Sequence, residues 1–422
     1  MDKKIMDYDV VIIGGGAAGL TAAIYCGRAR LKTLVIEKSL LGGLATYTNE
    51  IENYPGFPEP LNGLDLMKLF EQQAKRFGTE IKLTDVKGIK QLPDHTFMVE
   101  TFRVDYHAKS VIIATGGKPR LTGAANEENF LYDKGISFCA TCDAAYYTDK
   151  EVMVIGSGDA AIEEAMFLTK FASRVHVSVI HDEGVMDANK VAQERAMANE
   201  KLHLIWNTMV AEFRGEERLN CVVLRHTKTN ELIEVPVDGC FLFIGYIPNT
   251  EIFKGLVDMT RQGYILTDER METNIEGLFA AGDVREKGLR QVATCVGDGA
   301  IAGVSAEKYI AENEYLDTRV FQNKLPVIAY VWNPTDTTCR ELLPALDEIG
   351  RIYKDRISIV KIDAYKSAHM VERICDKTQA APPAIVVLKD GAVQGIYRDC
   401  LSLEALQKIA EEFLCGARSL EC

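Results

Sequence analysis

Two glycine-rich turns with a cysteine pair between them constrain this chain more than any other feature. The first turn is Gly14-Gly15-Gly16-Ala17-Ala18-Gly19, and the second is Gly156-Ser157-Gly158-Asp159-Ala160-Ala161. The pair, Cys139-Ala140-Thr141-Cys142, comes before the second turn. Each turn follows an apolar segment and precedes a helical pattern, which is the context that binds a dinucleotide pyrophosphate. The order predicts an α/β chain with two Rossmann-like nucleotide-binding domains and a thiol pair capable of redox chemistry.

Composition and charge predict a globular chain of two or three domains. The 422 residues are 47% hydrophobic and 26% charged, which is ordinary for a folded protein. The net charge of −13 argues against nucleic-acid binding through phosphate contacts. Residues 322–422 contain 13 Lys and Arg against 14 Asp and Glu, so the remaining chain carries a net −12. This uneven charge indicates a separate C-terminal module.

Hydropathy patterning sets the expected domain boundaries. We expect a first nucleotide-binding domain made of residues 1–118 and 246–315, with a second domain, 119–245, inserted into it. Residues 315–325 have the composition of a linker, and residues 322–420 form a small α/β unit. The N-terminus has no signal-peptide core, and no apolar run is long enough to cross a bilayer. A cytoplasmic protein is therefore expected.

The first turn has the complete context of a dinucleotide site. Gly14, Gly16 and Gly19 let the backbone approach a pyrophosphate, whose charge is favoured at a helix N-terminus. Glu37 ends the next strand 18 residues after Gly19, close to where an acid binds a ribose hydroxyl. The alternative is an ordinary glycine-rich turn, which a strand, helix and acid in these places disfavour.

The second turn is followed by acids where a phosphate site would need bases. The next strand ends in His181-Asp182-Glu183-Gly184-Val185-Met186-Asp187. The 2′-phosphate of NADPH needs Arg or Lys here, whereas an acid suits the free 2′-hydroxyl of NADH. Gly156, Gly158, Ala161, His181 and Asp182 are therefore candidate NADH-binding residues. The alternative is a solvated acidic loop that binds no nucleotide.

The cysteine pair is the candidate redox centre. Cys139 and Cys142 lie at a predicted helix start, a position that lowers a thiol pKa and favours the reactive thiolate. Asp143 follows directly and can pass a proton to a leaving thiolate or a flavin. The alternative is a pair of structural thiols.

The remaining cysteines and the histidines indicate no metal site. The chain has eleven cysteines but a single C-x-x-C, so a four-cysteine zinc site lacks its second pair. The seven histidines show no metal-ligand spacing. The cysteines expected to be small buried hydrophobic residues are Cys26, Cys221, Cys240, Cys295, Cys375, Cys400 and Cys415. This cysteine usage fits a reducing compartment.

These motifs together resemble the low-molecular-weight flavoprotein thioredoxin reductases of bacteria over about the first 315 residues. The motifs that carry the resemblance are the two glycine turns, Gly42-Gly43, Glu52-Asn53-Tyr54-Pro55-Gly56, Ala114-Thr115-Gly116, Cys139-Ala140-Thr141-Cys142-Asp143, Ala280-Ala281-Gly282-Asp283 and Arg290-Gln291. The resemblance implies FAD on the first domain, a homodimer, and an inserted domain that swivels so that the cysteine pair meets flavin and client in turn. It also implies that Cys142 is the sulfur on the flavin side.

The resemblance also implies a set of FAD-binding residues. Asp283, Arg290 and Gln291 are expected to close over the flavin. The other residues expected to bind FAD are Gly14, Gly16, Ala17, Ala18, Gly19, Glu37, Lys38, Gly43, Asn53, Ala114, Thr115 and Gly116.

This chain departs from its NADPH-using relatives after the second turn. Those relatives carry His-Arg-Arg-x-x-x-Arg, and aligning the His with His181 places Asp182, Glu183 and Asp187 on the three Arg positions. NADPH is therefore a poor expectation and NADH is favoured, as in the similar NADH-using flavoprotein that serves alkyl hydroperoxide reductase. Reduced ferredoxin is the rival donor, because ferredoxin-type flavin thioredoxin reductases have also lost the Arg cluster.

The C-terminal module resembles a thioredoxin domain that lacks its attacking cysteine. Where thioredoxin has Trp-Cys-Gly-Pro-Cys, this chain has Thr335-Asp336-Thr337-Thr338-Cys339. Asp336 is a good helix N-cap but no nucleophile toward disulfides. The module is therefore expected to dock a client or support the structure. A mixed disulfide through Cys339 is the alternative.

Three hypotheses of function follow. The first is a flavin-dependent reductase that passes electrons from a donor through FAD and the Cys139–Cys142 pair to thioredoxin or a similar protein disulfide. The second is electron supply to a peroxidase partner with the C-terminal module as adaptor. The third is a non-catalytic redox sensor that reacts with no pyridine nucleotide.

Overall fold

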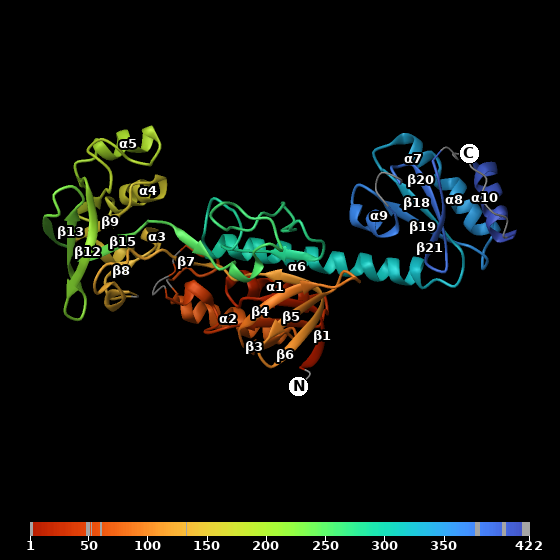
Figure 1. The fold of residues 1–422 in the computed structure, drawn as a ribbon, viewed down its shortest axis with the longest axis horizontal. Helices are drawn as coiled ribbons and strands as arrows, with labels where there is room; N and C mark the ends of the chain where they lie inside the picture. The colour runs from red at the N-terminus through yellow and green to blue at the C-terminus, as the bar shows by residue number, and fades with distance from the viewer. Residues whose placement is uncertain are drawn as a thin grey trace. The chain divides into compact units, whose positions relative to one another are not determined.

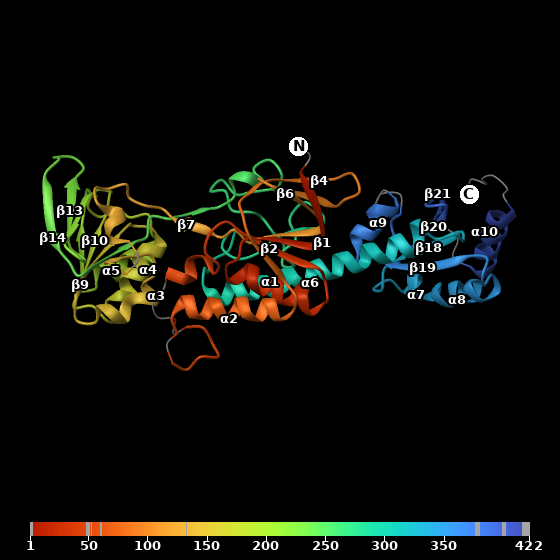
Figure 2. The same cartoon turned by 90° about the horizontal axis from the view of Figure 1, so that it is seen from below.

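A computed structural model describes residues 3–47, 51, 53–59, 61–131, 133–375, 380–398 and 402–415 of the chain (Figures 1 and 2). The residues form two compact units, Met1–Ala306 and Glu307–Cys422. Each unit is described by itself below.

A seven-stranded sheet forms the centre of the first unit. Its order is β3-β2-β1-β6-β5-β4, and β17 pairs with the end of β6. The strands are β1 Lys4–Ile13, β2 Thr33–Glu37, β3 Glu80–Leu83, β4 Val86–Gln91, β5 Phe97–Thr101, β6 Val104–Ile113 and β17 Leu278–Ala280. The pairs β1–β2, β1–β6, β2–β3 and β6–β17 are parallel, so the carboxyl ends of these strands meet at one edge. That edge is where an open α/β sheet binds its ligand.

Two helices that pack closely cover this sheet. Helix α1 (Ala17–Arg28) follows β1, and α6 (Val292–Leu316) lies against it in both views. The contact is close because α6 presents glycines. A Cβ added at Gly299 would lie 2.2 Å from the Ala18 carbonyl oxygen, and one at Gly303 would lie 3.0 Å from that of Ala22. Helix α2 (Gly63–Arg76) also packs on α1.

A second α/β layer lies between β6 and β17 in the chain. Its parallel sheet has the order β11-β10-β9-β15-β8. These strands are β8 Ile136–Ser137, β9 Glu151–Ile155, β10 Arg174–Ser178, β11 Leu202–Ile205 and β15 Gly239–Leu242. An antiparallel sheet of β12 (Thr208–Gly215), β13 (Leu219–His226) and β14 (Leu232–Pro236) packs with it in one core. The α-helices of this layer are α3 (Ala140–Asp143), α4 (Asp159–Leu168) and α5 (Lys190–Met197).

The chain enters and leaves this layer through a two-stranded ribbon. Strands β7 (Gly117–Pro119) and β16 (Tyr246–Pro248) pair antiparallel. Gly117 lies opposite Pro248, and Pro119 lies opposite Tyr246.

The second unit contains a four-stranded sheet of order β19-β18-β20-β21. Its strands are β18 Val327–Trp332, β19 Ser358–Asp363, β20 Ala384–Lys389 and β21 Ala392–Tyr397, and its helices are α7 Thr337–Glu341, α8 Leu343–Ile352, α9 Ala368–Ile374 and α10 Leu403–Cys415. Strand β18 pairs parallel with β19 and antiparallel with β20. Tyr330 and Val331 on β18 are fully buried, one in each of the two cores of this unit.

The structure differs from the sequence prediction between residues 315 and 325. We expected a linker there, but α6 continues to Leu316 and a π-helical turn follows at Asp317–Phe321. This segment is held by the second unit: the Arg373 guanidinium donates to Asn313 Oδ1 at 2.6 Å and to Asp317 Oδ1 at 3.0 Å. The first helices after β18 are two short ones, α7 and α8, separated at Leu342.

Candidate active site

The first glycine turn brings its predicted residues together at the carboxyl edge of the seven-stranded sheet. Gly14 has a φ of +108°, and a Cβ there would lie 2.3 Å from the Ala114 carbonyl oxygen. At Gly16, by contrast, the nearest atom to an added Cβ is the Gly42 carbonyl oxygen at 3.9 Å. The turn is therefore tight on its sheet side and open beside Gly16, which fits a ligand that approaches the backbone closely.

The acid after β2 lies at the same turn. Glu37 accepts hydrogen bonds from the backbone N–H of Gly15 at 2.8 Å and of Ser39 at 2.9 Å. Lys38 is exposed, and Gly43 begins a short 3-10 turn with a φ of +61°. The Glu37 carboxylate is thus fixed within reach of a nucleotide on this turn.

The end of β6 supplies the opposite wall. Thr115 Oγ1 donates to the Asn249 carbonyl at 2.7 Å, and Asn249 Nδ2 donates back to the Thr115 carbonyl at 2.9 Å. Gly116 then takes a φ of +60° before the chain enters β7. The Ala114–Gly116 segment therefore ends the sheet beside Gly14.

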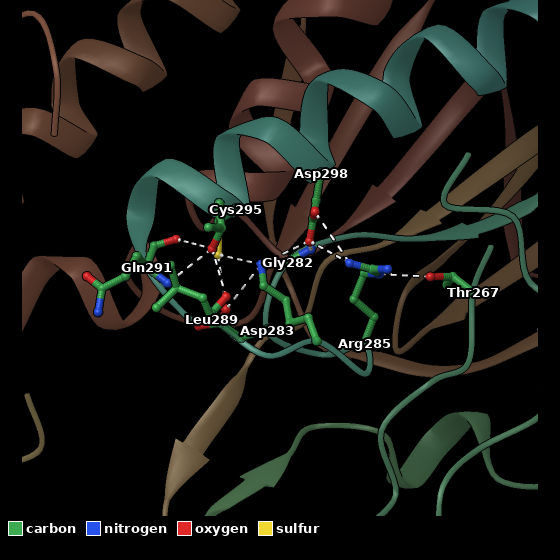
Figure 3. A network of polar contacts seen from close by, with 10 residues as sticks. Thr267, Gly282, Asp283, Arg285, Leu289, Gln291, Cys295 and Asp298 are labelled. Carbon is green, nitrogen blue, oxygen red and sulfur yellow. Dashed lines mark hydrogen bonds and ion pairs between the residues drawn. The ribbon is translucent and has the colours of Figure 1, made fainter. Parts of the chain in front are cut away.

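Asp283, Arg290 and Gln291 lie between β17 and the start of α6. Figure 3 shows Asp283 and Gln291. Gln291 Oε1 accepts from Asn53 Nδ2 at 3.1 Å, so the structure joins two residues expected at the flavin. The Arg290 guanidinium stacks on the Tyr264 ring at 4.3 Å, and its buried Nε has no hydrogen-bond partner among the described residues. A buried N–H without an acceptor is costly in the free protein, so it fits a site that a bound ligand completes.

The two predicted redox cysteines form a disulfide. Cys139 is the N-cap of α3, and its Sγ is bonded to that of Cys142 in the next turn. Ser137 organises the approach to this turn, because its hydroxyl accepts the Cys139 N–H at 3.1 Å. Sequence reasoning missed Ser137, which carries no motif of its own.

Asp143 directly follows Cys142 in the chain and is half-buried. Its Oδ2 accepts a hydrogen bond from Ser137 Oγ at 2.5 Å. Burial raises the pKa of Asp143, and the Ser137 hydrogen bond opposes this rise. A carboxyl group in this position favours its protonated form more than an exposed aspartate does, which suits a proton donor beside a thiolate.

An aromatic and basic surface follows the disulfide. Tyr146 is 54% exposed, with Lys150 Nζ 4.0 Å and the Arg218 guanidinium 5.0 Å from the centre of its ring. Two cations around an exposed ring stand out in a chain with a net charge of −13. The surface around Tyr146 is therefore locally basic.

The second glycine turn opens into a cavity of about 520 Å³. Gly156 has a φ of +131°, where an added Cβ would lie 2.5 Å from the Phe243 carbonyl oxygen, whereas Gly158 has no atom within 4 Å of this position. Ile180, Met209 and Phe243 supply apolar lining. The turn is again tight against its sheet and open toward the cavity.

Carboxylates, not bases, line this cavity. Asp159 and Asp187 contribute to the wall, and among its described residues there is no Lys or Arg. Asp187 Oδ2 accepts from Ser157 Oγ at 3.0 Å and pairs with His181 Nε2 at 2.9 Å. The hydrogen bond from His181 is the main reason that the pKa of Asp187 is lowered, so this carboxylate is charged at neutral pH.

The predicted residue Asp182 lies elsewhere. It forms an ion pair with Lys228 and is not part of the cavity lining. The acid that the loop actually turns toward the glycine turn is Asp187.

The C-terminal module has the local geometry predicted for its altered motif. Asp336 caps α7, and its Oδ1 accepts the Thr338 N–H at 2.8 Å. Cys339 is fully buried, and its carbonyl accepts from the Tyr330 hydroxyl at 2.8 Å. Because a buried thiol cannot meet a partner disulfide, this module does not present a reactive sulfur at Cys339.

The remaining cysteines fit the expected buried role in part. Cys26, Cys240 and Cys295 are buried, whereas Cys221 and Cys375 are half-buried. Cys400 and the side chain of Cys415 lie outside the described residues. Over the described ranges, no group of three or more His, Cys, Asp or Glu side chains is arranged to hold a metal ion. None of the helices in those ranges is long and apolar enough to cross a membrane.

Comparison with known proteins defines the family. The pyridine nucleotide-disulphide oxidoreductase family matches residues 8–299, and the thioredoxin family matches residues 307–412. The chain therefore belongs to the pyridine nucleotide-disulphide oxidoreductases, whose members use FAD and a nicotinamide cofactor.

Within that family the chain is similar to thioredoxin reductases. It is 44% identical over 311 residues to the thioredoxin reductase of Peptoclostridium litorale, covering 72% of this chain and 98% of the relative. It is 42% identical over 312 residues to that of Bacillus subtilis, covering 74% and 96%. The thioredoxin reductase structure from Streptococcus pyogenes matches with a TM-score of 0.67 at 40% identity, covering 72% and 98%. The chain is thus a thioredoxin reductase-like oxidoreductase fused to a C-terminal thioredoxin domain.

Proposed function

We propose that this enzyme reduces a protein disulfide of the thioredoxin type through FAD and the Cys139–Cys142 pair. The observation that carries the proposal is the disulfide at the start of α3 with the half-buried Asp143 directly after Cys142. FAD, when bound at the first glycine turn, supplies a pair of electrons. Two electrons and two protons convert the disulfide into two thiols, and Asp143 is placed to supply one of those protons. One of these thiols, as its thiolate, then attacks the client disulfide and forms a mixed disulfide. The second sulfur attacks that bond, which releases the reduced client and re-forms the Cys139–Cys142 disulfide.

The first turn and its surroundings fit FAD. Gly16 leaves the backbone accessible, and Glu37 is fixed within reach of a ribose. The buried Nε–H of Arg290 finds no acceptor in the described part of the chain. Asp283 and Gln291 belong to the same segment between β17 and α6 as that arginine. The surface around Tyr146 supports a thioredoxin-type client, because its cations would attract an acidic protein such as thioredoxin.

NADH is the donor that the second cavity supports over NADPH. The charged Asp187 lies at the second glycine turn, and no Lys or Arg lines the cavity in its described part. A 2′-phosphate would face repulsion there, whereas a 2′-hydroxyl can donate to a carboxylate.

The same carboxylate favours a second candidate donor, reduced ferredoxin. The hydrogen bond between Asp187 and Ser157 places negative charge on the turn that would otherwise face a pyrophosphate. A protein donor such as ferredoxin would not need to bind a pyrophosphate at that turn. Of the two donors, NADH is favoured over ferredoxin, because the apolar walls at Ile180 and Met209 suit an adenine ring.

The test is anaerobic bleaching of the flavin absorbance by each donor in turn. NADH is expected to bleach the flavin, and NADPH to do so at least tenfold more slowly. Equal rates with both nucleotides would contradict the charge argument. Bleaching by reduced ferredoxin alone would replace NADH by the second candidate. If the purified chain bound no flavin, the proposal as a whole would fail.

The C-terminal domain serves as a docking module, and the enzyme works as a homodimer. The burial of Cys339 and the capping role of Asp336 support docking over exchange chemistry. Cys339→Ser is therefore expected to leave turnover unchanged, with Cys142→Ser as the inactive control. A large loss in Cys339→Ser would favour the mixed disulfide instead. Light scattering on the purified chain tests the dimer.

A further inference from the structure

A buried thiol contacts Asp283. Cys295 lies in the first turn of α6 and is 9% exposed, and its Sγ lies 3.1 Å from Asp283 Oδ1 in donor geometry (Figure 3). None of the chemistry described above uses this thiol. The sequence predicted only a small hydrophobic residue here.

A charged network surrounds this pair. Lys287 Nζ lies 3.0 Å from Asp298 Oδ2 and 3.8 Å from Asp283 Oδ1. The Arg285 guanidinium adds a second ion pair to Asp298 at 3.4 Å. Two carboxylates and two cations thus balance in a largely buried cluster. Each group restricts the others, which is how such a network fixes the orientation of one carboxylate.

The thiol acts in this cluster as a donor. Burial, and next the negative charge of Asp283, raise the pKa of Cys295 well above that of a free thiol. The sulfur therefore keeps its proton and is a poor nucleophile. Asp283 can accept this proton in a hydrogen bond, whereas an alanine or valine at position 295 would offer it nothing.

The cluster adjoins the first glycine turn. A Cβ added at Gly282 would lie 2.8 Å from the Ala18 Cβ and 3.5 Å from the Cys295 sulfur. Ala18 belongs to the turn and to the start of α1. Gly282, the residue before Asp283, therefore packs against both the first glycine turn and Cys295, so Asp283 and Cys295 lie next to that turn.

We propose that Cys295 is a positioning residue for FAD: its thiol proton, supported by Lys287 and Asp298, holds the Asp283 carboxylate toward the bound cofactor. The inference rests on the proposed function, because it requires FAD at the first turn. It assigns to this cysteine a role in cofactor affinity that is separate from the redox exchange at Cys139 and Cys142.

The test compares FAD dissociation from the full chain in a matched set of variants, followed by flavin fluorescence. Cys295→Ala removes the donor and is expected to weaken FAD binding about tenfold or more, the scale of one hydrogen bond to a charged group. Cys295→Ser keeps a donor and is expected to stay within about twofold of the wild type. Cys240→Ala, at a fully buried thiol on β15, is the control that is expected to leave FAD affinity unchanged.

A double-mutant cycle separates positioning from packing. If Cys295 acts through Asp283, adding Cys295→Ala to Asp283→Ala will cause no further loss of FAD affinity. Additive losses, or an equal loss in the serine and alanine variants, would overturn the proposal. So would unchanged affinity in Cys295→Ala. If Cys295→Ala does not fold, Cys295→Val, which also offers Asp283 no donor, takes its place in the same comparison and cycle. Absence of FAD from the wild type would refute the proposed function, whereas FAD held equally by every variant would refute only the positioning role.

Discussion

Replacing Ser137 by alanine should move the pH dependence of disulfide reduction. Ser137 is 6% exposed, and its hydroxyl donates to Asp143 at 2.5 Å while accepting the Cys139 N–H at 3.1 Å. It therefore links the proposed proton donor to the redox helix. The substitution removes one oxygen and introduces no bulk, so the backbone of β8 can keep its place.

The expected direction follows from which protonation state the hydroxyl stabilises. The bond from Ser137 stabilises the charged carboxylate and so opposes the rise that burial causes in the pKa of Asp143. Without it, this pKa rises further. A hydrogen bond to a charged group contributes about 1.5–3 kcal/mol, and about 1.4 kcal/mol corresponds to one pH unit. Because Asp143 is only half-buried, we take the lower figure and expect a shift of about one pH unit.

The assay is turnover with a protein disulfide across a pH series at saturating donor. Asp143 must be protonated to act as an acid, so turnover falls as the pH rises through its pKa, and this falling limb should move to higher pH in Ser137→Ala. Ser137→Thr keeps the hydroxyl and should restore the wild-type limb. Ser110→Ala, at a buried serine of β6 that donates to the Gly277 carbonyl, controls for the loss of a buried hydroxyl. A pH profile in Ser137→Ala that superimposes on the wild type would refute the reasoning.

Three further predictions use other parts of the chain. Cys142→Ser should keep its flavin spectrum but lose turnover with a protein disulfide, and retained turnover would exclude the dithiol route. Asp187→Arg should raise the preference for NADPH over NADH in kcat/KM at least tenfold, since it exchanges repulsion of the 2′-phosphate for attraction; an unchanged ratio would contradict it. Burial and next the charge of His176 lower the pKa of His203, so the unfolded chain binds this proton more readily and stability should fall as the pH drops below about 6.5. Thermal unfolding at neutral and acid pH checks this prediction, and His203→Asn should show a weaker pH dependence.

The parts of the fold that short sequence motifs mark could be predicted from the sequence. Both glycine turns lie where a strand ends and a helix begins, because Gly14 and Gly156 must take positive φ values against a neighbouring backbone. The cysteine pair starts a helix as predicted. These features depend on residues a few positions apart, so spacing alone identifies them.

Features that depend on residues far apart in the sequence could not be predicted from motif spacing. The bond from Cys295 to Asp283 requires β17 and α6 to meet, and no motif marks it. Residues 315–325 have the composition of a linker, yet Arg373 from α9 holds this segment as helix. Among the acids after the second turn, only the folded loop distinguishes Asp187, which faces the cavity, from Asp182, which pairs with Lys228.

The ribbon of β7 and β16 limits how the inserted domain can move. The two crossings are hydrogen-bonded neighbours and cannot turn as independent single bonds. Any rotation of the insert would therefore be shared by both strands as a common twist. The bordering glycines, Gly116 and Gly245, could absorb it because glycine tolerates a wide range of φ. A connection made of two hydrogen-bonded strands twists about its own axis more easily than it bends across it. If the sulfur pair moves between flavin and client, as the resemblance implies, the paired ribbon would confine that movement to a single arc.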